Sequence, residues 1–350
     1  MIRAVGIDPG TVSIDVCGLI DGEVYLDQSW PTQQALASSD EFIRLLTEFG
    51  IPDLVAGPSG YGLPLIRAHE LTDADLRLAF LAGADEPGGI GGLRRFAKLL
   101  GSSGLPVVFL PGVIHLESVP EHRKLNRVDL GTADKLSAAV LGIQQECVRR
   151  GSRSDQVSFI LLELGGAFTA GVAVEQGQVV DGIGGTSGPI GWQAAGALDG
   201  EVAFLAGRIS KADLFQGGIS TLLERDRTRA SIAHDAYCEG AVKAVRQLRH
   251  SAPSARDILL SGRRSTPEMV ERLRRELADV GTVRRLNGFA QQAKEGAQGA
   301  ALLADGLAGG QYRDLVDRLG LRHAKGTVLD HLLFVSPDRA RQRLGLVAHA

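Results

Sequence analysis

Two stretches of the chain, one at its start and one near its middle, follow the same plan of strand, glycine turn, strand, tight turn and strand. In the first, IRAVGI (2–7) leads into Asp8-Pro9-Gly10-Thr11, a second apolar run covers 12–20, and Asp21-Gly22 turns the chain into 23–26. In the second, VSFILLEL (157–164) is followed by GGAFT, AGVAVEQ, a turn at Gly177 and QVVDGI. Apolar runs separated by such turns are typical of antiparallel meanders. The repetition predicts an internally duplicated protein.

Helices and strands alternate after each predicted meander, which indicates an α/β protein. In the first half we expect helices at about 40–49, 73–82 and 91–100, strands at 53–57 and 106–110, and a long connecting helix from about 130. In the second half we expect helices at about 199–206, 210–222, 228–250, 267–279 and 290–308, and strands at 257–260 and 282–285. The predicted domains are 1–153, 154–310 and a C-terminal extension, 311–350, with one or two helices and a strand at 327–335, packing on the N-terminal lobe. A ligand cleft is expected between the two halves, because domain interfaces often hold ligands.

Charge and cysteine content exclude several classes of function. The 38 Lys and Arg against 41 Asp and Glu give a formal net charge of −3, so no overall basic field favours nucleic acid or an anionic membrane. The three cysteines are far apart and form neither a disulfide framework nor a CxxC motif, which favours a reducing cytoplasm. We also expect no signal peptide and no transmembrane segment.

Glycine is enriched, at 45 of 350 residues against a usual level of about 7%, and it gathers where apolar runs end. Such junctions let a backbone approach a ligand closely. Neither GxxxxGK[ST] nor a complete GxGxxG after a strand occurs, which argues against a P-loop or a Rossmann site. The glycine turns therefore indicate close approach of the backbone to a ligand, without either of these two nucleotide motifs.

Five segments, in order, resemble the motifs of the actin, sugar-kinase and heat-shock-chaperone ATPase superfamily. They are GIDPGT (6–11), DLGTADKLSAAVLG (129–142), LLELGGAFTAGV (161–172), ILLSGRRS (258–265) and AKEGAQGAALLADG (293–306). The resemblance implies a duplicated two-lobe actin-like (ribonuclease-H-like) α/β fold with ATP and Mg²⁺ in an interlobe cleft. It also implies nucleotide-binding positions, which are Asp8, Gly10, Thr11, Gly165, Gly166, Thr169, Ser261, Gly262, Arg263 and Glu295. Asp8 and Glu163 are the implied metal-site acids, although Glu163 stands where many members carry Asp.

A closer resemblance is to a prokaryotic family described as butyrate-kinase-like. It rests on residues 113–135 and 179–203, and in the second segment Gly188-Pro189 followed by Leu198-Asp199-Gly200 resembles the acyl-side loop of butyrate kinases. The resemblance implies a short-chain carboxylate as phosphoryl acceptor, and we expect Lys124, Thr186, Ser187 and Gly188 on the substrate side. GIDPGT lacks the asparagine and the serine-rich turn with which acetate kinases begin.

Each candidate residue also has a purely structural interpretation. Asp8 is either a metal and phosphate-loop residue or the cap of a turn. Asp134 is either a general base or metal-water ligand, or an ordinary acid at a helix N-terminus. Glu163 interrupts an apolar strand, and burying an unpaired carboxylate is costly, which favours a site role. For a further group of residues both a functional and a structural role are possible, namely Arg123, Lys124 and Arg127 as charge-neutralising groups, and Lys135, Thr186 and Ser187. A structural role is favoured for His115, His122, Trp192 and Tyr61.

The leading hypothesis is an ATP- and Mg²⁺-dependent kinase of a small molecule, with Asp134, Glu163 and Arg123 as catalytic residues. Phosphoryl transfer depends mainly on positioning and charge stabilisation, which such residues supply. The alternatives are an alcohol kinase for a sugar or a pantothenate-like molecule, and an ATP-binding regulator without an acceptor. A carbamoyl-transfer ATPase would need a histidine metal pair, which the sequence lacks. The expected partner is a small-molecule substrate, with homodimerisation as one possible assembly.

Overall fold

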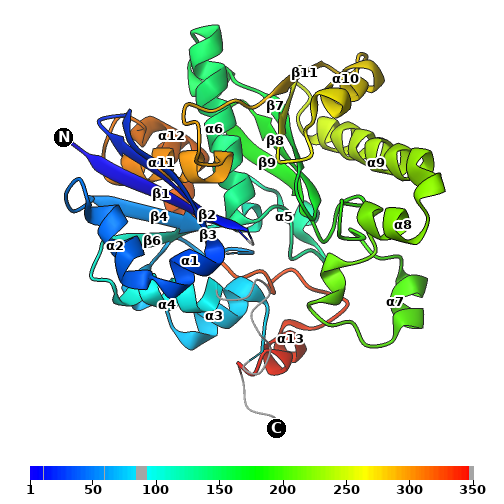
Figure 1. The fold of residues 1–350 in the computed structure, drawn as a ribbon, viewed down its shortest axis with the longest axis horizontal. Coiled ribbons are helices and arrows are strands. Elements are labelled where there is room, and N and C mark those ends of the chain that lie inside the picture. The colour runs from blue at the N-terminus through cyan, green and yellow to red at the C-terminus, as the bar shows by residue number, and fades with distance from the viewer. Residues whose placement is uncertain (11, 59, 84–92, 347–350) are drawn as a thin grey trace. The chain divides into compact units, whose positions relative to one another are not determined.

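The computed structural model describes residues 1–10, 12–58, 60–83 and 93–346, and these fall into two compact units. The first unit comprises Met1–Val128, Thr132–Ser154 and Asn287–Ala350, and the second comprises Asp129–Gly131 and Asp155–Leu286. Each unit contains one β-sheet with its own helices (Figure 1). The chain therefore leaves the first unit twice, briefly at Asp129–Gly131 and then over Asp155–Leu286, and returns to it for its last segment.

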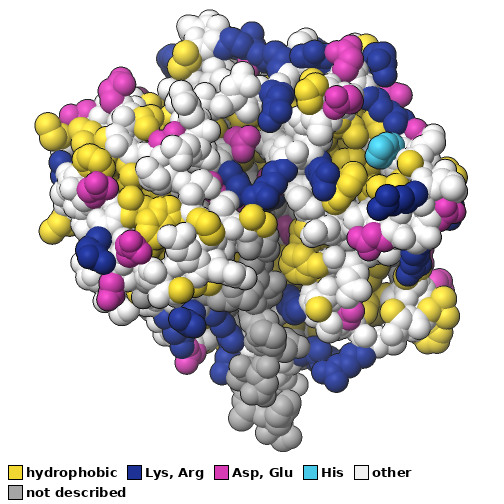
Figure 2. Space-filling view, in the orientation of Figure 1, with side chains coloured by type: hydrophobic (Ala, Val, Ile, Leu, Met, Phe, Trp, Pro, Cys, Tyr) yellow, Lys and Arg dark blue, Asp and Glu magenta, His cyan; other side chains and the backbone are white. Residues whose placement is uncertain are grey.

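The molecular surface carries mixed charge on the face drawn in Figure 2, where Lys and Arg side chains lie among acidic and apolar ones. Among the described residues, no helix combines the length and the apolar character needed to cross a membrane. None of the three cysteines forms a disulfide, and Cys17 and Cys238 are buried.

The first sheet begins with the predicted meander. Its strands are β1 (Arg3–Pro9), β2 (Ser13–Ile20), β3 (Glu23–Pro31), β4 (Leu54–Pro58), β5 (Ile66–Arg67) and β6 (Val107–Leu110). Their order in the sheet is β3-β2-β1-β4-β6-β5. The first three strands pair antiparallel, whereas β4 runs parallel to β1 and β6 parallel to β4. Short turns connect the antiparallel strands of the meander, whereas the parallel strands are connected through helices, as parallel pairing requires.

The second sheet repeats this topology. Its strands are β7 (Phe159–Leu164), β8 (Thr169–Glu175), β9 (Gln178–Ile183), β10 (Asp257–Ser261) and β11 (Thr282–Arg285), in the order β11-β10-β7-β8-β9. The strands β7, β8 and β9 form the antiparallel meander, β10 is parallel to β7, and β11 is parallel to β10. Strands β7 to β11 thus correspond to β1, β2, β3, β4 and β6, and the predicted duplication is confirmed.

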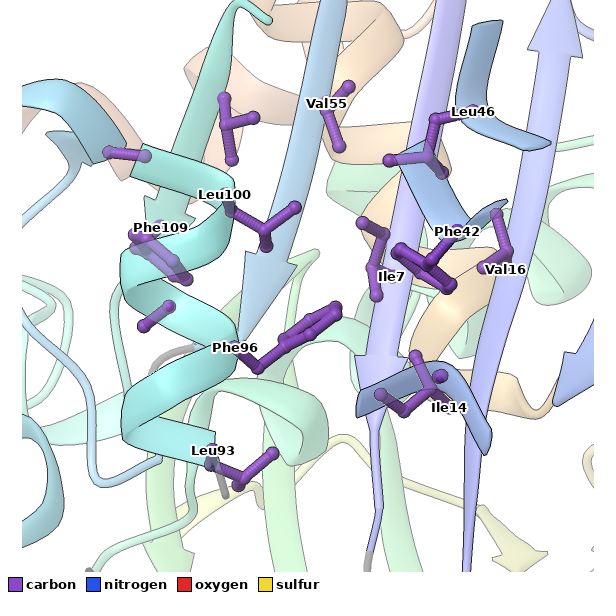
Figure 3. Close-up of a cluster of buried hydrophobic side chains, with 14 of the residues drawn as sticks. Ile7, Ile14, Val16, Phe42, Leu46, Val55, Leu93, Phe96, Leu100 and Phe109 are labelled. Carbon is purple, nitrogen blue, oxygen red and sulfur yellow. The ribbon is translucent and has the colours of Figure 1, made fainter. Parts of the chain in front are cut away.

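The first unit also contains helices, several of which bury apolar faces of its sheet. They are α1 (Thr32–Ala37), α2 (Ser39–Thr47), α3 (Asp73–Phe80), α4 (Leu93–Ser102), α5 (Glu121–Lys124), α6 (Ala133–Arg150), α11 (Glu295–Leu307), α12 (Arg313–Leu319) and α13 (Pro337–Arg343), with 3-10 turns η1 (Ala68–Glu70), η2 (Val113–His115) and η6 (Leu321–His323). Figure 3 shows one core cluster, in which Phe42 of α2 and Phe96 of α4 point toward each other, with ring centroids 5.3 Å apart. Ile7 of β1 and Ile14 of β2 complete this part of the cluster, so the strand that carries Asp8 is anchored by buried apolar side chains.

Helix α11 packs against β1, β4 and α6 at very short range. A methyl group at Gly6 of β1 would lie 2.1 Å from the Ala297 carbonyl oxygen, and one at Gly299 would lie 1.8 Å from the Ser137 carbonyl oxygen of α6. Only glycine permits this backbone-to-backbone approach. It brings the N-terminus of α11 to the end of β1, in the first unit.

The second unit also contains helices, of which α9 (Ala230–Ser251) and α10 (Pro267–Glu276) contact its sheet. The others are α7 (Gly200–Ala206) and α8 (Ile219–Arg225), with 3-10 turns η4 (Asp213–Phe215) and η5 (Arg227–Arg229), while η3 (Ser154–Gln156) leads into β7. Helix α9 contacts β7, β8 and β9, and buried Tyr237, Val245 and Leu248 of α9 belong to the core of this unit.

Two predicted elements are wrong. Residues 327–335 form turns rather than a strand, because Thr327 and Asp330 hydrogen-bond to each other and Asn126 Oδ1 accepts from the backbone amides of Leu333 and Phe334, at 2.8 and 2.9 Å. The helix expected over 210–222 is broken, since Gly217 takes a φ of +80° and α8 begins only at Ile219. The C-terminal segment belongs to the first unit, where Arg77 donates to the carbonyl oxygens of Leu344 and Gly345.

Candidate active site

Two carboxylates lie close together in the first unit. Asp8 lies near the end of β1, and Asp134 lies in the first turn of α6. Gly296 of α11 packs on Asp8 so closely that a methyl group there would lie 2.6 Å from Asp8 Oδ2. Asp134 accepts hydrogen bonds from the Thr132 hydroxyl and from Lys135 Nζ, the latter at 2.5 Å. The structure therefore brings together the two acids that the sequence placed in separate motifs.

The two carboxylates ionise differently. Burial, followed by the negative charge of Asp134, raises the pKa of Asp8 to about 7. Burial also acts against ionisation of Asp134, but Lys135 and the Thr132 hydroxyl outweigh it and hold the pKa of Asp134 below its usual range. Near neutral pH, Asp134 is thus ionised and Asp8 is close to its titration midpoint. A cation bound beside the pair would favour the ionised form of Asp8.

Asp15 and Lys294 form a buried ion pair next to Asp8 that the sequence motifs did not predict. Asp15 of β2 is the cross-strand partner of Asp8, and its side chain is fully buried. Lys294, the residue before α11, donates to Asp15 Oδ2 and, at 2.6 Å, to Ser13 Oγ. Ser13 Oγ in turn donates to Asp15 Oδ2 at 2.9 Å. An acid inside the apolar run of β2 was a signal that a cation must be near, but the sequence does not tell which cation.

Two hydrogen bonds to the backbone of Gly10 close the turn between β1 and β2. The Gly10 amide donates to the Ser13 carbonyl at 2.8 Å, and the Thr32 hydroxyl donates to the Gly10 carbonyl at 2.8 Å. Thr11, the other predicted phosphate-loop residue, lies outside the described residues. Glu295, also predicted to bind the nucleotide, is the first residue of α11 and lies in the same unit.

The second unit holds the other predicted phosphate loop. Glu163 is half-buried on β7, and a methyl group at Gly165 would lie 3.2 Å from Glu163 Oε1. The Gly165 amide donates to the Phe168 carbonyl at 2.9 Å, which closes the turn, while Gly166 faces open space. Thr169 is buried, and its hydroxyl donates to the Ile190 carbonyl at 3.3 Å.

The predicted adenosine motif follows β10 in the second unit. Ser261 pairs with Glu163 across the parallel strands, and Gly262 adopts a φ of +87° against the Leu164 carbonyl. The buried Ser261 hydroxyl has no hydrogen-bond partner within the described part of the chain. Arg263 is exposed, whereas its neighbour Arg264 stacks over Trp192 with its guanidinium carbon 3.6 Å from the ring centroid.

The turn over residues 184–188 is tied to a buried acid. Asp129 Oδ2 accepts from both the backbone amide and the hydroxyl of Thr186, each at 3.0 Å, and the Ser187 hydroxyl donates to the Asp129 carbonyl at 2.6 Å. Gly188 is buried against Gly184 and Thr169. These hydroxyl groups, predicted on the substrate side, thus shape the turn in this structure.

The basic run after residue 120 contains one buried cation. Lys124 Nζ donates to the Leu116 carbonyl at 2.9 Å, and burial lowers the pKa of this ammonium. Arg123 is half-buried on α5, and Arg127 is exposed. His115 is buried, its Nδ1 lies 3.3 Å from the Gly112 carbonyl oxygen, and burial lowers its pKa to about 4, in keeping with a structural role.

Residues 6–334 match the family model described as protein of unknown function (DUF1464). The chain belongs to this family. No curated protein sequence matches it.

Solved structures of acyl kinases resemble this family member over most of its length. A propionate kinase from Francisella tularensis subsp. tularensis SCHU S4 has a TM-score of 0.60 at 11% identity, covering 85% of this chain and 99% of that chain. Acetate kinases from Entamoeba histolytica and Porphyromonas gingivalis have TM-scores of 0.53 and 0.51, with 10% and 12% identity, covering 79% and 75% of this chain and 85% and 83% of theirs. The chain therefore has the two-lobe actin-like α/β fold that the sequence predicted.

The titration of Asp8 gives a first testable prediction. Since its pKa rises from 3.8 to about 7 on folding, the folded state binds more protons than the unfolded state between these values, and stability must fall as pH rises through this range. Without divalent metal, we expect the free energy of unfolding of wild type to fall by about 2 kcal/mol more than that of Asp8→Asn between pH 5 and pH 8. Urea denaturation in EDTA measures this difference.

Asp314→Asn, at an exposed acid of α12, is the control for that experiment. It should follow the wild-type pH dependence. If the free energy of unfolding changes with pH by the same amount in wild type and in Asp8→Asn, then Asp8 ionises normally in the folded protein.

Proposed function

We propose that this protein is an ATP- and Mg²⁺-dependent phosphotransferase for a small molecule, with a short-chain carboxylate as the first candidate acceptor. The observation that carries the proposal is the Asp8 and Asp134 pair beside the Gly10 turn, with Lys135 and Lys294 next to it. Support for the acceptor comes from the fold, which is that of solved structures described as propionate and acetate kinases.

The residues of the first unit fit a magnesium ion. The described part of the chain has no cluster of three or more His, Cys, Asp and Glu side chains arranged for a metal, which argues against a cage made entirely by protein. Mg²⁺ instead favours one or two carboxylates completed by water and phosphate oxygens. Asp8 would supply one such carboxylate. When bound, the ion would neutralise charge on the phosphates.

The chain's own residues have distinct roles in this proposal. Gly10 lets the backbone of the β1–β2 turn approach phosphate oxygens, and Asp134 orients an acceptor or accepts its proton. In the second unit, Gly165 and Gly166 let the backbone approach phosphate, Glu163 acts as an acid beside them, and Gly262 with Arg263 belongs to the nucleoside side. Arg123 remains a proposed charge-stabilising group.

The test is Mg²⁺-dependent ADP release with short-chain carboxylates, sugars and pantothenate as acceptors, an acceptor-free control, and hydroxylamine to trap acyl phosphates. We expect release to depend on a carboxylate and hydroxamate to accumulate. Release with an alcohol alone would favour the alcohol-kinase alternative. ADP release that no acceptor changes would replace the kinase proposal with an ATP-hydrolysing regulator.

A further inference from the structure

We infer that Lys294 binds a phosphate oxygen as the fixed positive charge of the first phosphate loop, and that Asp15 is the residue that positions it. The inference rests on the proposed function only for the identity of the ligand, a nucleotide. Lys294 lies in the segment 293–306 that carries the resemblance, but the resemblance assigned no role to Lys294 or to Asp15.

The ammonium lies at the loop itself. A methyl group at Gly10 would be 3.4 Å from Lys294 Nζ, which places the charge over the β1–β2 turn. An ammonium has three N–H donors, and Ser13 and Asp15 accept two of them. The Lys294 side chain is 30% exposed, while that of Asp15 is 1% exposed. The pair is thus buried on the acid side and open to solvent on the lysine side, where an anion can reach it.

The segment that carries Lys294 is held in place before α11 begins. Asp27 of β3 accepts the backbone amides of Gln291, Gln292 and Ala293, at 2.7 to 3.1 Å. Gln298 Oε1 accepts the amides of Phe289 and Ala290, at 2.7 and 3.1 Å. A cation on such a segment needs little reorganisation to meet a phosphate, which is how preorganised charge lowers a barrier.

A contribution to stability does not by itself explain why Asp15 is buried at this position. Its Oδ1 is buried without a hydrogen-bond partner within the described part of the chain, so the ion pair is incompletely satisfied. Apolar residues would often stabilise such a position better than a buried pair does. A buried acid that holds a partly exposed lysine over a glycine turn is explained by a need for a positioned cation there.

Calorimetric titration with two probes tests the inference, namely ATP and inorganic tripolyphosphate, each with Mg²⁺, and adenosine serves as a phosphate-free reference. The variants are Lys294→Met, Asp15→Asn and the double variant. The double variant removes both charges together, so it leaves no uncompensated buried acid and guards against misfolding. Lys98→Met, which removes an exposed lysine paired with Asp73, is the matched control.

We expect Lys294→Met to weaken both phosphate probes by about 10- to 100-fold, the range for a hydrogen bond to a charged group. Adenosine binding should not change. Because Asp15 acts through Lys294, the double variant should bind no more weakly than Lys294→Met, which is the non-additivity expected of coupled residues. Lys98→Met should bind as wild type does.

The outcomes separate this inference from the proposed function. If the double variant binds tripolyphosphate as tightly as wild type, the lysine has no phosphate role, and wild-type kinase turnover would still stand. If phosphate binding depends on Lys294 but ATP is never consumed, the inference holds and the kinase proposal fails. Wild-type protein that binds neither probe would overturn both.

Discussion

Replacing Asp134 with Asn is expected to reduce phosphorylation of an alcohol acceptor by about 10²- to 10⁴-fold, the usual contribution of general base catalysis. A hydroxyl must lose its proton to become a nucleophile, and Asp134 is held ionised by Lys135 and Thr132. A carboxylate acceptor is already ionised, so acyl phosphate formation should fall by only about tenfold. Steady-state ADP release, measured for each acceptor with hydroxylamine trapping, gives both numbers.

The control is Asp40→Asn, which removes another acid from the first turn of a helix, α2. If Asp134 only complements its helix dipole, the two variants should behave alike and lose about 1 kcal/mol of stability or less. Equal losses of turnover with both acceptor classes would instead identify Asp134 as a metal ligand. Alcohol turnover near the wild-type level would contradict the base assignment.

Replacing Gly299 with Ala is expected to destabilise the protein by about 3 kcal/mol or more. In an open helix this change would be favourable by about 1 kcal/mol, because alanine has the higher helix propensity. Here the added methyl would lie 1.8 Å from the Ser137 carbonyl oxygen and 2.4 Å from its carbonyl carbon. These are backbone atoms of α6, so no rotamer change relieves the overlap and the two helices must separate. Urea denaturation measures the loss.

Gly200→Ala is the matched control, because no heavy atom lies within 4 Å of a methyl group at this first residue of α7. It should change the free energy of unfolding by less than about 0.5 kcal/mol. A similarly small change for Gly299→Ala would show that α6 and α11 do not pack at the distance described. Because Lys294 precedes α11, a separated helix should also weaken tripolyphosphate binding.

Most of the secondary structure was predictable because its signals are local. Alternation, β-branched residues and turn glycines fall within a few residues of the strands that they form, and both meanders follow them. The failures lie where a local pattern competed with side-chain contacts from elsewhere. The apolar run TVLDHLLFV forms turns because Asn126, far away in the sequence, accepts two of its backbone amides.

The candidate site was predictable in part. Asp8 and Asp134 follow from an acid at a strand end and an acid at a helix start, and the structure brings them close enough to influence each other's ionisation. Lys124 shows the opposite case, because a basic residue in a basic run gives no sign of whether its charge is exposed. In the structure it is buried against the Leu116 carbonyl.

The sequence by itself determined the duplicated α/β plan, the glycine turns and the two candidate acids Asp8 and Asp134, because each depends on the order of neighbouring residues. Only the tertiary structure decided which cation accompanies the first loop. Asp15 and Lys294 are 279 residues apart, and the residues next to each of them in the sequence do not indicate that the two side chains form an ion pair. They meet because α11 can approach β1 only at glycines, and because a carboxylate buried by β2 requires a positive charge within hydrogen-bonding distance.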